Sequence, residues 1–180
     1  MIQVYLPKTL LSCPPILPDT TLLTIANNPI VELPELRHTK LNSIFCDLTL
    51  LTELPELPDT IRFVDVSFTF LTKLPDLKQM LRLDLQSTFI SDLPPLPTTL
   101  RALNCDDTPF SKRFPMPDGE SYLEYAERMK SMQRIRARNQ KIGLALTELF
   151  WHPDRIARLV DKYGLDEFED HVGNEFRFQF

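Results

Sequence analysis

The side chains that could carry catalysis are few, and they are spread over the whole chain. A thiol and two carboxylates are adjacent at residues 105–107 (Cys-Asp-Asp), and the three histidines are His38, His152 and His171. A nucleophilic or acid–base site needs such groups within hydrogen-bond reach of one another. The histidines are far apart in sequence and lack metal-ligand spacing, and there is no glycine-rich phosphate loop. We therefore predict a protein without enzymatic activity, with no metal site and no cofactor.

Four basic residues could instead bind an anion. Lys130, Arg134, Arg138 and Lys141 are spaced by 4, 4 and 3 residues, which places them on one face of a helix. Such a face could contact phosphates and make the protein a nucleic-acid-binding protein. It could equally be an ordinary solvated face, or one that pairs with the acidic first part of the chain. We keep nucleic acid as the less favoured alternative.

The elements that position these residues follow from a repeat. A Leu-Pro step recurs every 19 to 21 residues, and the residues around it are similar from copy to copy, as in "LTELPEL" and "LTKLPDL". The four clearest steps are Leu33-Pro34, Leu54-Pro55, Leu74-Pro75 and Leu93-Pro94. Self-similarity at this period is typical of leucine-rich repeats. The sequence predicts an α/β leucine-rich repeat solenoid with a parallel sheet on the concave side and a polyproline-like convex side.

Alternation within each repeat predicts which residues face inward. In "LPDTIRFVDVSFTFLTKL", Ile61, Val64, Val66, Leu71 and Leu74 occupy the apolar positions, and the next copy supplies Leu81 and Leu83 in the first two of them. After each strand, the turn position that often holds asparagine reads Asn28, Thr49, Thr69, Thr88 and Thr108. We predict that these threonines form a hydroxyl ladder that satisfies backbone groups of the turn.

The outward positions of the strands then form a candidate binding surface. Carboxylates gather there beside two phenylalanines, a combination that suits a basic protein partner. The predicted partner-binding residues are Phe45, Asp47, Phe63, Asp65, Arg82, Asp84, Asn104 and Asp106. The sequence thus favours a non-enzymatic protein–protein interaction module that uses its concave face.

A second part follows the repeats, and we place the boundary between residues 1–117 and 118–180. The stretch from Ser121 to Phe150 has no proline and shows helical periodicity, with Asp118 as the expected N-cap. A second helix is expected after Pro153, ending near Gly164. A repeat stack must cover the open core of its last coil, so we predict that these helices form a C-terminal cap.

Composition limits the compartment and the partner. The net charge is −5, and residues 1–110 hold 13 acidic against 8 basic side chains, which does not favour nucleic acid there. There are three cysteines without a C-x-x-C pair, so a reducing compartment fits, with Cys46 and Cys105 buried in the core. The first residues, "MIQVYLPKTL", do not show the basic and apolar pattern of a secretory leader, and no stretch approaches 18 consecutive apolar residues. We expect a cytoplasmic protein without a membrane partner, monomeric or weakly homo-oligomeric.

The repeat resembles the short leucine-rich repeats of bacterial effector proteins and of large DNA viruses of amoebae. The segment "LFWHPDRIARLVDKYG" is similar to a C-terminal segment of Marseillevirus- and Mimivirus-type proteins, through Trp151, Pro153, Arg155 and Ile156. The resemblance implies a viral protein of the host cytoplasm or the virion, and it adds a structural role in the virion to the alternative function of the basic helix. Bacterial effectors that are ubiquitin ligases carry a Cys-x-Asp motif in a helical domain after the repeats. Here the motif at Cys105 falls on an inward strand position, and residues 111–180 contain no cysteine, which argues against that activity.

Overall fold

The computed structural model describes residues 2–4 and 12–150, together with residues 152, 154, 157, 158 and 161. The chain forms two compact units, Met1–Gln133 and Arg134–Phe180. Residues 118–133 therefore belong to the same unit as the repeats. The predicted division into modules at residues 117 and 118 stays a prediction.

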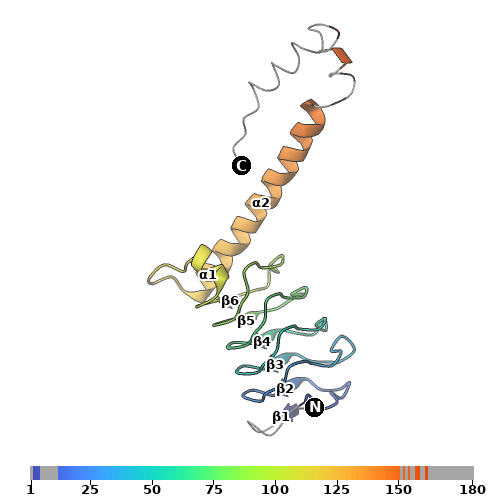
Figure 1. The fold of residues 1–180 in the computed structure, drawn as a ribbon, viewed down its shortest axis with the longest axis vertical. Coiled ribbons are helices and arrows are strands. Elements are labelled where there is room, and N and C mark those ends of the chain that lie inside the picture. Colours follow the sequence, from blue (N-terminus) through green and yellow to red (C-terminus); the bar gives the residue numbers. More distant parts are fainter. Residues whose placement is uncertain are drawn as a thin grey trace. The chain divides into compact units, whose positions relative to one another are not determined.

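The first unit is built around one parallel sheet, in which each strand pairs with the next one in the sequence (Figure 1). Each strand has three residues, and consecutive strands stack as the rungs of a ladder (Figure 1). The strands are β1 (Ile2–Val4), β2 (Leu22–Thr24), β3 (Ser43–Phe45), β4 (Phe63–Asp65), β5 (Arg82–Asp84) and β6 (Ala102–Asn104). Unbroken parallel order with a period of about twenty residues leaves room for only one short strand per coil.

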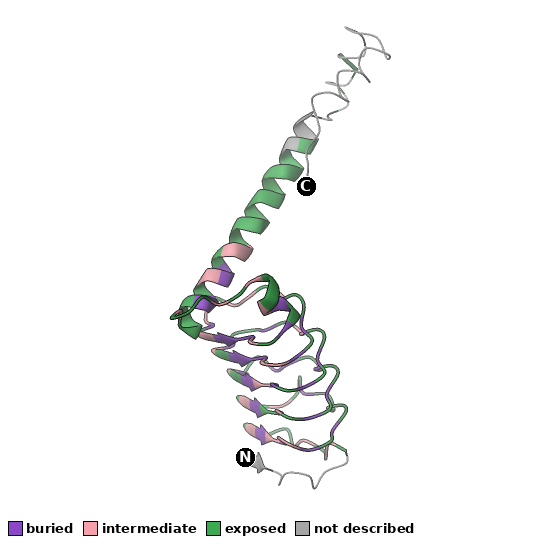
Figure 2. Ribbon diagram, turned by 60° about the vertical axis from the view of Figure 1, so that its left-hand side comes forward, coloured by how far each residue is buried: buried purple, intermediate pink, exposed green. Residues whose placement is uncertain are grey.

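The core lies between the sheet and the return segments (Figure 2). The middle residue of each strand from β2 to β6 points inward and is buried, as are the residues that follow the strands at the predicted apolar positions. These residues include Leu23, Ile25, Ile44, Cys46, Val64, Val66, Leu83, Leu85, Leu103 and Cys105. Full burial of a leucine or isoleucine side chain stabilises a fold by roughly 1.5–3 kcal/mol. The inward pattern read from the sequence is confirmed at these positions.

One inward position is shifted from its predicted place. The residue two before each strand is buried, and in the fifth coil that residue is Met80 with none of its surface exposed, whereas Leu81 is only half-buried. The prediction that Leu81 fills this position is wrong. The coil between β4 and β5 is one residue shorter than the coil before it. Local alternation cannot locate such a deletion, because both Met80 and Leu81 are apolar.

The threonine ladder is confirmed. Each hydroxyl donates to the carbonyl of the residue three positions earlier: Thr49 to Cys46 at 2.7 Å, Thr69 to Val66 at 2.7 Å and Thr88 to Leu85 at 2.7 Å. Thr108 repeats the bond to Cys105 at 2.6 Å, and Asn28 donates to Ile25 and Ala26, both at 3.0 Å. All five side chains are buried, so these bonds satisfy carbonyls that water does not reach.

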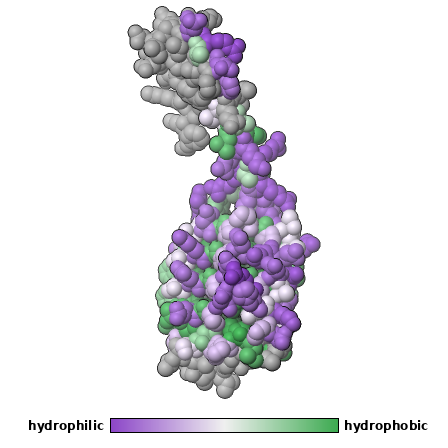
Figure 3. All heavy atoms as spheres, turned by 90° about the vertical axis from the view of Figure 1, so that its right-hand side faces the viewer, coloured by the Kyte–Doolittle hydropathy of each residue, from purple (hydrophilic) through white to green (hydrophobic). Residues whose placement is uncertain are grey.

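Between β1 and β6, the return segments contain neither helix nor strand in the described residues, as the Leu-Pro steps predicted. Their outer surface is charged. Arg37 lies within 3.2 Å of Glu35 and 3.6 Å of Glu56, all of them exposed. Figure 3 views this side, and hydrophilic residues cover most of it. Exposed pairs of this kind contribute little to stability. The stacked parallel strands and the return segments without regular secondary structure confirm that the first unit is a leucine-rich repeat solenoid.

Two helices follow the last strand: α1 (Pro109–Arg113) and α2 (Tyr122–Phe150). In α1, Thr108 and Ser111 form a reciprocal capping box, and Pro109 occupies the first turn. The start of α2 is capped by Ser121, whose hydroxyl accepts from the Glu124 amide at 3.3 Å while Glu124 accepts from the Ser121 amide at 2.8 Å. Asp118 is therefore not the N-cap, because the chain turns at residues 118 and 119 before the helix begins.

The first three turns of α2 cover the last coil. Tyr125, Ala126 and Met129 are buried in the same core as the repeats. Gln133 ties the helix to the return segment of the fifth coil, because its oxygen accepts from the Leu96 amide at 2.8 Å and its nitrogen donates to Pro94 at 3.0 Å. The helix thus supplies the cap that the open end of a repeat stack requires. The second predicted helix, with Trp151, Pro153, Arg155 and Ile156, lies outside the described residues apart from isolated positions.

Candidate functional site

The outward residues of β2–β6 form columns that run across the strands, and we call this surface the sheet face. The register pairs Phe45 with Asp65, Asp65 with Asp84, and Asp84 with Asn104. The neighbouring column pairs Phe63 with Arg82. Most of the residues singled out from the sequence therefore lie side by side on one face of the first unit.

Two phenylalanines are the apolar feature of the sheet face. Phe45 ends β3 and is 37% exposed, and Phe63 begins β4 and is 38% exposed. Their diagonal placement on adjacent strands follows from the register, in which Phe45 lies opposite Asp65 and Phe63 lies opposite Ser43. An aromatic side chain that is this exposed has apolar area left to bury against a partner.

The polar residues of the sheet face are partly used inside the molecule. Asp65 accepts from the Ser67 amide at 3.1 Å and from the Ser67 hydroxyl at 2.7 Å. Asp84 accepts from Asn104 at 3.0 Å and from the Gln86 amide at 3.2 Å. Such bonds to the backbone two residues ahead fold the side chain down along the sheet. Asp65 and Asp84 therefore help to hold the turns after their strands.

Asp84 and Asn104 occupy outward strand positions, as predicted, but both are buried there. Asp84 is 8% and Asn104 is 9% exposed, so neither can offer much surface to another molecule. Asn104 also accepts from the Asp106 amide at 3.1 Å, and Arg82 lies 3.7 Å from the outer oxygen of Asp84. Asp47, Asp65 and Asp106 remain half-buried and Arg82 exposed.

The sheet face has an excess of negative charge. The pKa of the Asp47 carboxyl is raised above its usual value, first by burial and then by the nearby charges of Asp65 and Asp84. A carboxylate that lies near other negative charges attracts a cationic group, because the positive charge relieves the repulsion. Chemically, the surface suits an amine or guanidinium next to an apolar group.

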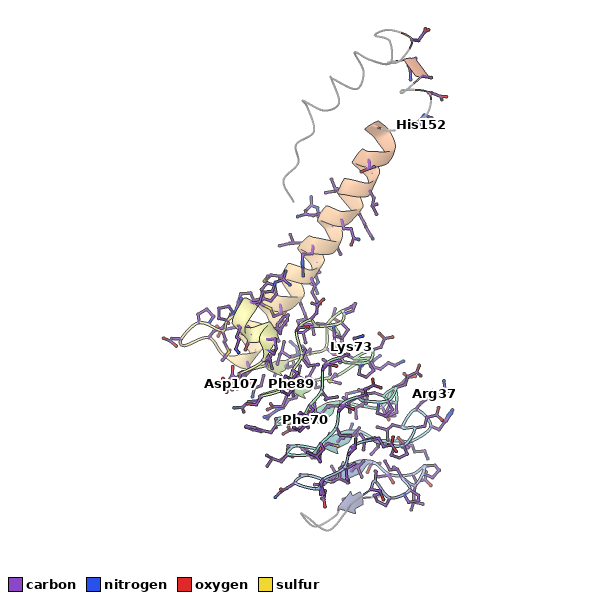
Figure 4. All side chains as sticks on the ribbon, viewed as in Figure 1. Arg37, Phe70, Lys73, Phe89, Asp107 and His152 are labelled. Carbon is purple, nitrogen blue, oxygen red and sulfur yellow. The ribbon has the colours of Figure 1, made fainter. Side chains whose placement is uncertain are left out.

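A second apolar feature borders the sheet face and was missed in the sequence. Five large apolar side chains follow strands β3, β4 and β5, and each is about half exposed. We call them the rim strip: Leu48 at 53%, Leu50 at 43%, Phe68 at 47%, Phe70 at 49% and Phe89 at 55%. The Phe70 and Phe89 rings stack with centroids 5.9 Å apart, and Figure 4 shows them next to each other and away from Arg37. Aligning the residues between the inward positions would have revealed the strip.

The basic set on α2 has to be corrected at its first member. Lys130 is 3% exposed, and its ammonium donates to the carbonyls of Leu100 at 2.9 Å and Thr98 at 3.4 Å and lies 2.7 Å from Glu127. It is buried because α2 turns this face towards the last coil. Arg134, Arg138 and Lys141 belong to the second unit and are exposed.

The nucleophile candidates are protected. Cys46 and Cys105 are buried and free, as predicted. Burial raises the pKa of the Cys105 thiol to about 12 and that of the half-buried Cys13 thiol to about 11. Since the thiolate is the nucleophile, a raised pKa lowers the reactivity of these thiols at neutral pH.

The histidines do not gather with other ligands in the part of the chain that the structure describes. His38 lies 3.7 Å from Glu35 and His152 lies 3.6 Å from Asp154, while His171 is outside the described residues. Within these residues, no group of three or more His, Cys, Asp or Glu side chains could hold a metal ion. None of the described helices combines the length and the apolar character needed to cross a lipid bilayer.

The solved structures that are similar to the chain include two of YopM. One is YopM, a leucine-rich effector protein from Yersinia pestis, with 26% identity and a TM-score of 0.46, over 56% of this chain and 35% of that one. The other is YopM from Yersinia enterocolitica WA-314, with 21% identity and a TM-score of 0.39, over 54% and 31% of the two chains. The similar part thus spans about a third of each YopM chain. No protein-family model and no curated protein matches the chain.

Proposed function

We propose that the protein is a non-enzymatic interaction module that binds a protein partner through the sheet face, which is the predicted concave side. The observation that carries the proposal is the pair Phe45 and Phe63, which are 37% and 38% exposed on adjacent strands of a rigid parallel sheet. Burial of an aromatic anchor at a hot spot contributes on the order of 2–4 kcal/mol to binding.

The charge around this pair supports a basic partner. Asp47, Asp65 and Asp106 stay half-buried, although Asp65 also accepts from Ser67 and Asp106 accepts from the Tyr122 hydroxyl. Arg82 is the single basic side chain among the predicted contact residues. Carboxylates on the edge of an interface speed association and select the partner more than they add affinity. A lysine- or arginine-bearing segment with an apolar side chain is the ligand that this surface fits.

The test is affinity capture from a cell lysate, in which the bound proteins are identified and quantified. The Phe45→Ala/Phe63→Ala double variant should lose most of the partner that wild-type protein retains. The control is Leu144→Ala, which removes an exposed apolar side chain of the second unit. Equal recovery by wild type and the phenylalanine double variant would refute binding through the sheet face.

The alternative is nucleic-acid binding, or a structural role in a virion, through the basic residues of α2. Of the four residues predicted for this role, Arg134, Arg138 and Lys141 are exposed, whereas Lys130 is buried. An Arg134→Glu/Arg138→Glu variant tests it in the same capture assay. Loss of recovery that is confined to this variant and sensitive to nuclease would favour the alternative. The cytoplasmic location and the viral lineage stay predictions.

A further inference from the structure

The rim strip is held in place by the same backbone bonds that stack the coils. The Leu48 amide donates to Ser67 at 3.0 Å, and the Phe68 amide donates to Gln86 at 2.8 Å. The Phe70 amide donates to Leu51, and the Phe89 amide donates to Leu71, both at 2.9 Å. These bonds connect neighbouring coils, so the side chains of the strip are aligned in two rigid columns, with Leu48 and Phe68 in one and Leu50, Phe70 and Phe89 in the other.

The size of the strip exceeds what scattered surface residues produce. Five large apolar side chains, each about half exposed, present on the order of 500 Å² of apolar surface together. Contiguous apolar patches of this size on a soluble protein commonly mark binding sites. The Phe70–Phe89 stack shows that the second column is continuous between these two coils.

The backbone of the first column has a conformation that lowers stability when it carries bulky apolar residues. The column reads Asn27, Leu48, Phe68, Ser87 and Asp107, and all five residues have φ between 54° and 58°. This left-handed conformation suits asparagine, aspartate and glycine, whereas a bulky apolar residue is strained there. Leu48 and Phe68 are bulky apolar residues in this strained backbone conformation. Both are about half exposed, so burial of their side chains offsets little of the strain. Their presence has no explanation in the stability of the repeat.

Charge on the two borders of the strip differs. On the side of the strands, the corresponding residues are Asp47, Ser67, Gln86 and Asp106, and Asp107 is exposed at the end of the first column. On the side of the return segments, the corresponding residues alternate in sign: Glu53, Lys73, Asp92 and Lys112. A ligand along the strip thus meets negative charge on one border and no net charge on the other.

We propose that the rim strip binds a partner segment that carries apolar side chains flanked on one side by lysine or arginine. The apolar side chains of the partner contact Leu48, Leu50, Phe68, Phe70 and Phe89. Its lysine or arginine side chains reach Asp47 and Asp106. This inference deepens the proposed function, since it extends the contact surface from the sheet face to its border. It is nevertheless carried by separate residues, so the two can fail separately.

The experiment uses the full chain and a random dodecapeptide library displayed on phage. Enriched peptides should contain aromatic or aliphatic residues next to lysine or arginine. One such peptide is then synthesised, and its Kd is measured for each variant. Phe70→Thr/Phe89→Thr should raise the Kd at least tenfold. Absence of enriched peptides, enrichment of acidic peptides, or an unchanged Kd would overturn the proposal.

A second pair of variants separates binding from folding. Leu48→Asn/Phe68→Asn places in both positions the residue type that Asn27 already shows in this column. We expect this variant to keep or raise the Tm, by up to a few degrees, while the Kd rises at least tenfold. The matched control is Ser87→Asn, which makes the same backbone change without removing an apolar side chain and should leave the Kd unchanged. A clear fall in Tm for the double variant would show that the strip serves the fold instead.

The same peptide also distinguishes the two proposals. If Phe45→Ala/Phe63→Ala leaves its Kd unchanged while the rim variants raise it, the strip is a binding site and the sheet face is not. If only the Phe45 and Phe63 variant raises the Kd, the proposed function stands and the rim inference is wrong. A rise with both sets shows one continuous surface, as we expect.

Discussion

Replacement of Lys130 by methionine should destabilise the capped end of the solenoid. Methionine keeps the length and packing of the aliphatic stem, so the substitution removes mainly the ammonium group. The ammonium is held between the carbonyls of Leu100 at 2.9 Å and Thr98 at 3.4 Å and the carboxylate of Glu127 at 2.7 Å. Lys130→Met leaves these acceptors without their charged donor.

The magnitude follows from the exposure of each partner. Glu127 is 51% exposed, so its bond adds little, and the long contact with Thr98 is weak. The short bond to Leu100 has a charged donor and a buried environment, and such a bond contributes about 1.5–3 kcal/mol. Removing a buried charge also relieves the cost of keeping it out of water, which offsets part of this loss. We expect a net decrease of about 2 kcal/mol in the free energy of unfolding, a substantial part of the 5–15 kcal/mol that is typical of a domain.

The assay is chemical denaturation followed by circular dichroism, with Arg134→Met as the matched control. Arg134 lies one turn further along the same helix and is exposed, so its replacement should change the free energy of unfolding by no more than about 0.5 kcal/mol. If Lys130→Met were as stable as Arg134→Met, the buried ammonium would not contribute to stability, and the account of α2 as an anchored cap would be wrong at this contact.

Three further predictions concern the repeats. Thr69→Val leaves the Val66 carbonyl without its donor and should lower the free energy of unfolding by about 1 kcal/mol, whereas the exposed Thr72→Val should not, as denaturation would show. Cys105, whose thiol pKa is raised to about 12 by burial, should react with a polar thiol reagent only as fast as the protein unfolds, and rapid labelling in the native state would contradict its burial. The carboxyl pKa of Asp47 is raised in the folded state, chiefly by burial, so stability should fall as pH rises from 3.8 through the folded pKa. Asp47→Asn should lack that loss and be at least as stable at neutral pH. A pH series of unfolding curves for both proteins would decide the matter, and an equal loss in the variant would contradict the assignment.

The repeat architecture was predictable because its causes are local and recur. In each coil the strand, the buried apolar residues and the turn threonine occur at nearly the same spacing. The assignment made in one repeat is therefore supported by the others. The hydroxyl bonds of Thr49, Thr69 and Thr88 join residues only three positions apart. Short-range bonds of this kind can be inferred from residue type and position alone.

The burial and backbone conformation of individual residues were less predictable. Asp84 and Asn104 occupy outward strand positions by alternation, but a bond of 3.0 Å between neighbouring strands folds both against the sheet. Lys130 shares its helical spacing with Arg134 and Arg138, and helical periodicity cannot say which side of a helix will meet the last coil. Leu48 and Phe68 look like ordinary loop residues until the left-handed backbone beneath them is known.

The sequence by itself determined the period, the inward residues, the turn ladder and the parallel order of the strands, because each depends on spacing within or between adjacent coils. The tertiary structure alone decided that Lys130 is buried, that Asp84 and Asn104 are engaged within the sheet, and that five apolar side chains line up along its border. The physical reason is that exposure depends on contacts between residues from different coils, such as the Phe70–Phe89 stack across 19 positions. A chain with a linear repeat specifies its own stacking, but the surface that results exists only once the coils have packed.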